Sequence, residues 1–403
     1  MTEKNFDRLH FDGIQTLRGL AAILVVMEHI RFFACGAFGV DIFFCISGFM
    51  IMLTTQNNTG YFFRKRLIRI VPFYWIMTLG SFALMMLFPS MFQSSEATLS
   101  RLTKSLLFIP FDIGNGVLQP LLRIGWTVNC EMFFYLLFWL AFHISHKYRG
   151  LLCSIFLLVC TGLGTMLSGG CTLTGENLLS ARTPSFLAAL FSASAAVTAE
   201  GAAAVSPWLA PIYFYGSPVM LEFALGILCY YMAKIIYKKC AVFRQNSIPV
   251  SSQSNQEHSD STSPRQWASR LTGIILLLLG LSILVILACS AKQVNILGYR
   301  RFIVWGIPAM AAVLCFSLGG FILPMPRPAV RLGDISFSIY MIHYYPIMFL
   351  DRKIFDFSTM RPASLAGACL GLLLVILLAA AAWYLIEKKL TGWLRKHFLP
   401  VKF

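Results

Sequence analysis

Arg18 and His29 lie eleven residues apart in the apolar segment 14–35 (IQTLRGLAAILVVMEHIRFFAC). That interval is close to three helical turns, so both side chains leave a helix on nearly the same face, about 16 Å apart along its axis. Ionisable groups in a membrane helix are costly unless they are paired or hydrated. Because Glu28 stands beside His29, the spacing predicts a polar track that faces a protein interior and could carry chemistry.

The composition indicates a polytopic membrane protein. The mean hydropathy is +0.72, and 58% of the 403 residues are hydrophobic while 12% are charged. Ten apolar runs are long enough to cross a hydrocarbon core of ~30 Å. They are residues 14–35, 38–54, 66–88, 126–144, 150–168, 211–236, 271–289, 302–323, 334–351 and 364–386. We therefore expect an all-α bundle of about ten transmembrane helices with both termini in the cytoplasm.

The net charge of +16 is explained by this topology rather than by nucleic-acid binding. The segments assigned to the cytoplasm hold roughly twice as many Lys and Arg residues as the outer segments, which follows the positive-inside rule. The eleven cysteines form no CxxC pair and no His/Cys ligand spacing, so we expect no metal site.

The chain is expected to form a single membrane domain over residues 1–403. Residues 244–270 are rich in serine and poor in aliphatic side chains, which predicts a flexible cytoplasmic loop. Residues 387–403 form a short basic C-terminal tail. The stretch 186–205 is rich in Ala and Ser, and we assign it to an outer or re-entrant element because a further span would reverse the charge bias.

Four ionisable residues from four predicted spans share the outer half of the membrane: His29, Asp41, Glu131 and His343. A histidine with a nearby carboxylate is the minimum for general-base chemistry, because the carboxylate orients the ring and stabilises the imidazolium after proton abstraction. This match of depths makes His29 a candidate base, with Asp41 or Glu131 as its partner.

A second group of charges lies at the predicted cytoplasmic end. Residues 61–75 (YFFRKRLIRIVPFYW) carry Arg64, Arg66 and Arg69 into the third span, and Arg18 reaches the same side. Guanidinium groups bind phosphate oxygens with two parallel hydrogen bonds. Such a basic mouth suits an anionic donor made in the cytoplasm, for example a nucleotide thioester.

These residues also have purely structural explanations. Basic clusters at cytoplasmic helix ends are the usual result of membrane topology and of attraction to anionic lipids. A histidine in a membrane helix can simply bond a neighbouring helix. Asp41 and Glu131 can each neutralise a nearby cation, with Arg31 and Arg123 as candidates. Glu28 is also placed to pair with Arg31, three residues further on.

Six segments in order resemble the membrane-bound acyltransferase-3 family, which modifies bacterial surface glycans and other acceptors. They are LRGLAAILVVMEH, FGVDIFFCISGFMI, FRKRLIRIVPFYW, WTVNCEMFFYLL, ISFSIYMIHYYPI and YLIEKKL, and they span roughly residues 14–388. The sequence departs from the family pattern at its last motif, where Lys388 and Lys389 follow Glu387 in place of Arg-Pro. The resemblance implies a multi-pass O-acyltransferase of the bacterial inner membrane.

The resemblance also implies roles for particular residues. Acyl-CoA, most simply acetyl-CoA, would be the co-substrate, with no bound cofactor. Its phosphates would be held by Arg18, Arg64, Arg66 and Arg69, while His29 acts as base with Glu131 or Asp41. Residues that support the site or hold the acceptor would be His343, Ser47, Trp126 and Tyr340.

The partners implied are membrane lipid, acyl-CoA and a glycan or lipid-linked sugar. The oligomeric state is not predicted. The alternative is a transporter or flippase for a glycan or lipid-linked intermediate, in which the polar track conducts substrate and no bond changes.

The separation of the two charged groups predicts that donor and acceptor approach from opposite sides of the membrane. Phosphates would lose hydration in crossing a core of ~30 Å, so only the thioester arm of the donor should reach the outer half. In sealed vesicles, acyl-CoA added outside should support transfer only when the cytoplasmic face points outward. Equal activity in both orientations, with vesicle integrity verified, would reject the cross-membrane arrangement.

Overall fold

The computed structural model describes residues 11–56, 61–89, 92, 97–113, 118–168, 210–246, 264–291 and 298–399. The described chain is almost entirely helical. Its elements are α1 (Asp12–Glu28), α2 (Gly39–Thr54), α3 (Phe62–Leu87), α4 (Leu99–Leu106), β1 (Phe111–Asp112), β2 (Leu118–Gln119), η3 (Arg123–Gly125), α5 (Trp126–Ile144), α6 (Arg149–Ser168), α8 (Ala210–Tyr215), η4 (Pro218–Met220), α9 (Leu221–Asn246), α10 (Pro264–Ala291), α11 (Gly298–Arg301), η5 (Phe302–Gly306), α12 (Ile307–Ile322), α13 (Arg327–Asp334), α14 (Ser336–Ile342), α15 (Tyr344–Lys353), α16 (Pro362–Ala382), η6 (Trp383–Leu390) and α17 (Thr391–Phe398). The two short strands pair antiparallel, whereas η5 and η6 are π-helical.

Seven helical segments of the described chain are long and apolar enough to cross a membrane. They are Phe62–Leu87, Arg123–Ile144, Arg149–Met166, Pro218–Lys239, Ala268–Ser290, Gly298–Ile322 and Pro362–Phe398, and each overlaps one predicted span. The prediction of an all-α polytopic membrane protein is confirmed. The count of ten spans and the location of the termini remain predictions.

The three remaining predicted spans are shorter or interrupted. The first was expected over residues 14–35, but α1 ends at Glu28, because the chain turns there and the Glu28 carboxylate accepts the N–H groups of Gly36 (2.8 Å) and Ala37 (3.0 Å). The second corresponds to α2, whose 16 residues extend for about 24 Å.

The ninth predicted span, residues 334–351, is divided among α13, α14 and α15, with breaks at Ile335 and His343. Pro346 explains the second break, because proline cannot donate to the carbonyl four residues earlier and its ring crowds that carbonyl. The first break follows Gly333, where the backbone of α13 approaches that of α1: a Cβ added at Gly333 would lie 1.9 Å from the Gln15 carbonyl oxygen.

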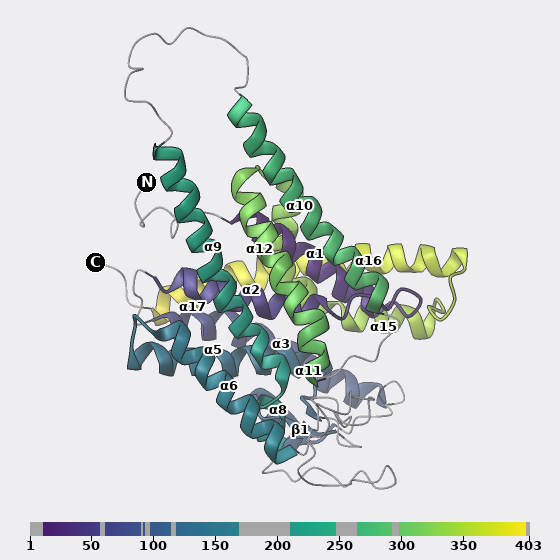
Figure 1. The fold of residues 1–403 in the computed structure, drawn as a ribbon. Coiled ribbons are helices and arrows are strands. Elements are labelled where there is room, and N and C mark those ends of the chain that lie inside the picture. Colours follow the sequence, from purple (N-terminus) through teal and green to yellow (C-terminus); the bar gives the residue numbers. More distant parts are fainter. Residues whose placement is uncertain are drawn as a thin grey trace, which may run out of the picture.

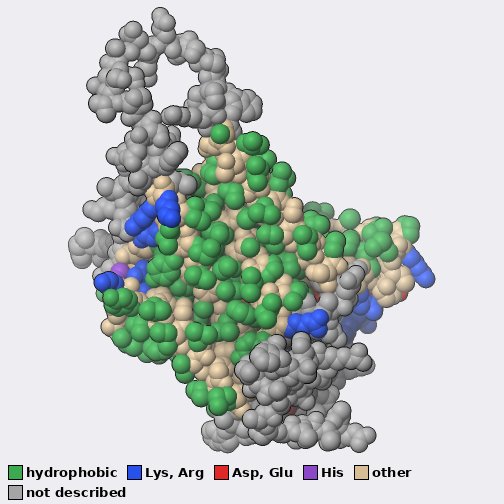
Figure 2. All heavy atoms as spheres, viewed as in Figure 1, with side chains coloured by type: hydrophobic (Ala, Val, Ile, Leu, Met, Phe, Trp, Pro, Cys, Tyr) green, Lys and Arg blue, Asp and Glu red, His purple; other side chains and the backbone are tan. Residues whose placement is uncertain are grey.

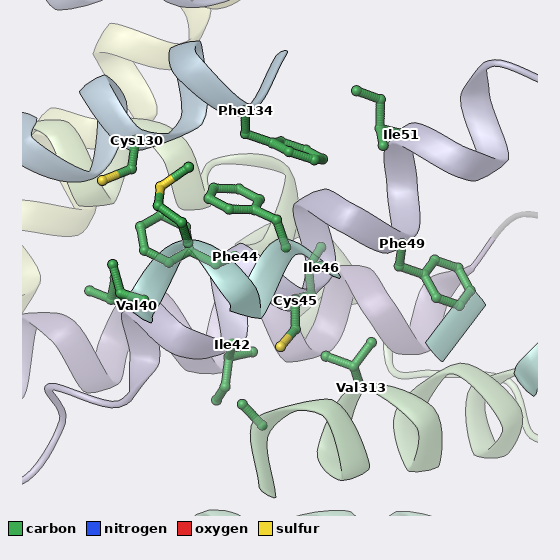
Figure 3. Close-up of a cluster of buried hydrophobic side chains, with 14 of the residues drawn as sticks. Val40, Ile42, Phe44, Cys45, Ile46, Phe49, Ile51, Cys130, Phe134 and Val313 are labelled. Atoms are coloured by element: carbon green, nitrogen blue, oxygen red, sulfur yellow. The ribbon is translucent and has the colours of Figure 1, made fainter. Parts of the chain in front are cut away.

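The helices form one bundle around α2. Figure 1 shows α9, α10 and α12 alongside one another, with α1 and α2 crossing them, and α2 packs against α9. Figure 3 shows Ile42 and Cys45 of α2 on the side of Val313, while Phe44 lies toward Phe134. This apolar core keeps α2 buried on several sides.

The outer surface of the bundle is apolar. Figure 2 shows hydrophobic side chains covering the face formed by α10 and α12, with Lys and Arg at its margins. From Leu271 to Ile286, all the large hydrophobic side chains that α10 exposes are Leu, Ile or Val. A broad apolar face of this kind on a spanning helix fits contact with lipid rather than with water.

Two predicted irregular segments are partly helical. Of the predicted loop 244–270, residues 247–263 lie outside the described residues, while α9 continues to Asn246 and α10 begins at Pro264, a residue type well suited to a first helical turn. Of the predicted tail 387–403, η6 and α17 continue the helix to Phe398, shortly before Pro400. The stretch 186–205 lies outside the described residues.

Substitution of Gly226 tests the contact between α2 and α9. A Cβ at Gly226 would lie 2.0 Å from the Cys45 carbonyl oxygen, so the G226A variant must push the helices apart, at a cost of about 1–3 kcal/mol. We expect a lower midpoint of thermal unfolding in detergent. The matched control is G162A, because a Cβ there meets nothing within 4 Å and alanine favours helix by up to about 1 kcal/mol. Equal midpoints for the two variants would contradict this packing.

Candidate active site

One cavity, here called the arginine cavity, gathers polar side chains from five helices. Its volume is about 100 Å³. Arg18 comes from α1, Ser47 from α2 and Tyr340 from α14, and the remaining polar lining residues are Arg66 and Arg69 of α3 and Thr127, Glu131 and Tyr135 of α5. The other lining side chains are apolar, including Phe43, Phe44, Met50 and Phe337. The cavity therefore combines cationic groups with an apolar wall.

The Glu131 carboxylate is fixed by two hydroxyl groups. Ser47 Oγ donates to Glu131 Oε1 at 3.0 Å, and the Tyr135 hydroxyl donates to the same oxygen. The Arg66 guanidinium lies over the Tyr135 ring, with Cζ 5.3 Å from the ring centroid. Glu131 thus presents a negative charge of defined orientation among the arginines.

The three arginines make few contacts with the described residues. Arg18 Nη1 donates to Gln15 Oε1 at 3.0 Å, and Arg66 Nη2 donates to Thr54 Oγ1 at 3.3 Å. Arg18 also lies within electrostatic range of Arg69 and Glu131. Each guanidinium has five N–H donors, so donors remain that can bind an anion.

A histidine pair lies at the end of α1. His29 Nδ1 is 2.9 Å from the Val25 carbonyl oxygen and 3.3 Å from His343 Nε2, while His343 Nδ1 is 2.7 Å from the Tyr340 carbonyl oxygen. Carbonyl oxygens only accept, so both Nδ1 atoms carry the proton in this arrangement. His343 Nε2 then accepts a hydrogen bond from His29 Nδ1, and His29 Nε2 is left as the basic nitrogen.

Tyr340 lies between the arginine cavity and the histidine pair. Its side chain lines the cavity, and its ring centroid is 5.7 Å from that of His343. The Tyr340 hydroxyl accepts from Thr127 Oγ1 at 2.7 Å and donates to the Ile124 carbonyl at 3.0 Å. The short helix α14 therefore positions one side chain against both groups.

The structure corrects the expectation that Glu131 lies apart from the arginines. Glu131 lines the same cavity as Arg18, Arg66 and Arg69. The depth was counted from the start of the span, but the chain is already inside the protein there, since Leu121, Leu122 and Ile124 are all buried. Counting from that helix end therefore does not measure distance from the membrane surface.

Asp41 lies in a buried ion pair. Arg301 donates from Nε to Asp41 Oδ1 at 3.1 Å and from Nη2 to Oδ2 at 2.8 Å, and the Asp41 side chain is 0% exposed. Glu222, also fully buried, interacts electrostatically with both. Trp126 lies beside the pair, with Arg301 Cζ 5.9 Å from its ring centroid.

The alternative in which Glu28, Asp41 or Glu131 neutralises Arg31 is not found in the described chain. Arg31 Nη2 instead bonds Asp351 at 2.9 Å and Asp356 at 3.1 Å. Hydrogen bonds from Ser358, with a smaller contribution from Arg31, lower the pKa of Asp356.

The predicted site residues thus fall into separate groups. The cavity brings together Arg18, Arg66, Arg69, Glu131, Ser47 and Tyr340, and His29 pairs with His343. Asp41 and Trp126 lie with Arg301, whereas Arg64 is exposed and lies over the Tyr61 ring. Within the described chain, the hydrogen bonds of His29 run to Val25 and His343 and not to a carboxylate. The catalytic and binding roles of all these residues remain predictions.

Sequence reasoning missed Tyr135 and Arg301. Tyr135 is four residues after Glu131, so the two share a helical face and the spacing could have revealed the contact. Arg301 carried a weaker signal: a buried Asp41 needs a cation, but nothing local selects one 260 residues away. No group of three or more His, Cys, Asp or Glu residues in the described chain is arranged to hold a metal ion.

The model of the acyltransferase-3 family, described as the acyltransferase domain, matches residues 11–384. The chain belongs to this family. It is a multi-pass membrane member of the acyltransferase-3 family, and its seven long apolar helices support the membrane assignment.

A curated relative of this acyltransferase is "Exopolysaccharide production protein ExoZ" from Rhizobium meliloti (strain 1021). The two are 39% identical over 112 residues, which make up 26% of this chain and 34% of the relative. The alignment thus spans about a third of the relative's length. No solved structure matches the acyltransferase significantly.

Removing Arg301 should destabilise the acyltransferase. The R301Q variant leaves the buried Asp41 carboxylate without its cation, and breaking a buried pair in this way costs about 3–5 kcal/mol. We expect a clear drop in the midpoint of thermal unfolding, partly recovered in the D41N/R301Q double variant. R300Q is the matched control, since Arg300 is the exposed neighbour. A normal midpoint for R301Q would show that the pair contributes little.

Proposed function

We propose that this acyltransferase moves an acyl group, most simply acetyl, from cytoplasmic acyl-CoA to a hydroxyl of a lipid-linked or surface polysaccharide sugar at the outer face of the bacterial inner membrane. One observation carries the proposal: α1 bears Arg18, which lines the arginine cavity, and is followed by its C-cap residue His29, whose Nδ1 lies within hydrogen-bonding distance of the Val25 carbonyl oxygen and of His343 Nε2.

The arginine cavity supports the donor half of the proposal. Arg18, Arg66 and Arg69 hold phosphate oxygens of acyl-CoA through charge-assisted hydrogen bonds. The apolar wall, with Phe43, Phe44 and Met50, accepts the less polar arm and the acyl group. Tyr340 at the far side of the cavity leads toward the histidine pair.

The histidine pair supports the chemical step. His29 Nε2 takes the proton of the acceptor hydroxyl while the hydroxyl oxygen attacks the carbonyl carbon of the thioester. The tetrahedral intermediate collapses, the carbon–sulfur bond breaks, and the sulfur leaves as a thiolate. The imidazolium returns its proton to the thiolate, so the products are an ester and free CoA. His343 Nε2 accepts from His29 Nδ1 throughout, which orients the ring and stabilises its positive charge.

A glycan acceptor is supported by the relative rather than by the geometry. The relative's printed name concerns exopolysaccharide production, which makes a sugar hydroxyl the first acceptor to test. Membership of the acyltransferase family favours this enzyme over the alternative of a transporter or flippase, in which no thioester bond would break.

Replacement of His29 tests the proposed base. With purified protein, acetyl-CoA and membrane glycan extract, the H29A variant should release free CoA thiol about 10²–10⁴-fold more slowly than wild type, since that is the usual contribution of a general base. Mass spectrometry of the glycan should show the matching loss of acetyl groups.

The matched control is H143A. His143 Nδ1 bonds the carbonyl four residues earlier at 2.8 Å, as His29 does, but His143 is exposed. Both variants should express and unfold like wild type. Turnover near wild-type rates in well-folded H29A protein would rule out the proposed base.

A further inference from the structure

The C-terminal segment places two more charged side chains, the partly buried Glu387 and the exposed Arg395, within electrostatic range of the arginines that line the cavity. The family match ends at residue 384, but the chain continues through η6 and α17, and both pack against α3. α3 is the helix that carries Arg66 and Arg69 into the cavity. The C-terminal segment therefore lies beside the helix that carries two arginines of the proposed donor site.

Glu387 in η6 faces the same guanidiniums as the proposed donor phosphates. Its carboxylate accepts a hydrogen bond from Ser338 Oγ of α14 and interacts electrostatically with Arg69 and Arg18. Glu387 lies in a π-helical turn, a geometry that occurs often at functional sites. This carboxylate acts as an internal counter-ion for arginines on two other helices.

Arg395 in α17 adds a further positive charge. It lies within electrostatic range of Arg69 and Arg66, and no ion pair joins it to a carboxylate of the described chain. Like charges held together by helix packing repel one another, and the repulsion is relieved when a multiply charged anion binds between them. The arrangement thus favours an anion of higher charge than a carboxylate.

We propose that η6 and α17 complete a phosphate site at the arginine cavity: Arg395 supplies a fourth guanidinium beside Arg18, Arg66 and Arg69, and Glu387 occupies the site until a donor phosphate displaces it. A phosphate monoester carries about −1.5 to −2 charges at pH 7, against −1 for a carboxylate, so the phosphate is the stronger ligand. The proposal rests on the proposed function, because that function supplies the phosphorylated donor.

Two substitutions should change donor affinity in opposite directions. R395Q removes an attractive charge and should raise the Kd for coenzyme A about three- to tenfold. E387Q removes the competing anion and should lower that Kd by a similar factor, while its amide oxygen still accepts from Ser338. A purely structural role of the segment would instead make both variants bind more weakly.

The measurement is titration of the full chain with coenzyme A in nanodiscs of zwitterionic phosphatidylcholine. K396Q is the matched control, since Lys396 is the next residue on the same helix, is exposed like Arg395 and carries the same charge. R395K keeps the charge but loses the two-pronged donor, so its Kd for coenzyme A should lie between those of wild type and R395Q. If R395Q folds poorly, R395K should still bind coenzyme A more weakly than wild type. At about 1 M salt, where charges are screened beyond about 3 Å, the differences should shrink.

Each result decides a particular point. Suppose that wild type binds coenzyme A and releases thiol, and that R395Q, E387Q and K396Q all bind coenzyme A with the wild-type Kd. The proposal that Arg395 and Glu387 belong to the phosphate site is then wrong, and the proposed function stands. If R395Q changes only the binding of phosphatidylglycerol nanodiscs, the anion is a lipid headgroup and the donor assignment is overturned. If wild type neither binds coenzyme A nor releases thiol from acetyl-CoA, the proposed function fails as well.

Discussion

The turn held by the Glu28 carboxylate is the contact on which the rest of the site depends. By accepting the N–H groups of Gly36 and Ala37, Glu28 ends α1 and starts the return of the chain into α2. A helix that continued would leave His29 inside a regular turn, whereas here His29 is the C-cap residue directly after α1, and its ring nitrogen Nδ1 lies within hydrogen-bonding distance of Val25 and His343. The same turn brings Ser47 of α2 to Glu131.

Irregular backbone occurs where protein, not lipid, surrounds it. In an apolar medium every backbone N–H and C=O must find a partner within the protein. The breaks at Ile335 and His343 lie next to α1, and Ser336, Ser338 and His343 beside them are fully buried. The helices that lack full spanning length thus contribute Arg18, Ser47 and Tyr340 to the arginine cavity beside residues of the long helices α3 and α5, while α10 presents an apolar face outward.

The sequence predicted local relations well and long-range ones poorly. The shared helix of Arg18 and His29 follows from helical periodicity, and Arg66 and Arg69 follow from their position at the start of an apolar run. The pairing of His29 with His343, 314 residues away, and of Asp41 with Arg301 depends on which helices pack together, and hydropathy does not record this. Glu131 was expected apart from the arginines, although it lines the same cavity, because the buried residues before α5 were counted as lying outside the bundle.

Because α1 is one unbroken helix, it holds the backbone positions of Arg18 and of His29, its C-cap residue, about 16 Å apart along its axis. These two backbone positions cannot approach each other without breaking backbone hydrogen bonds that have no replacement in an apolar environment. A substrate that uses both must therefore be long, with its anionic end far from its reactive carbon. A nucleotide thioester has that form. A small phosphorylated acyl donor has its phosphate and carbonyl adjacent, so it could contact Arg18 or His29 but not both. The rigidity of a single helix thus selects the donor class by length as well as by charge.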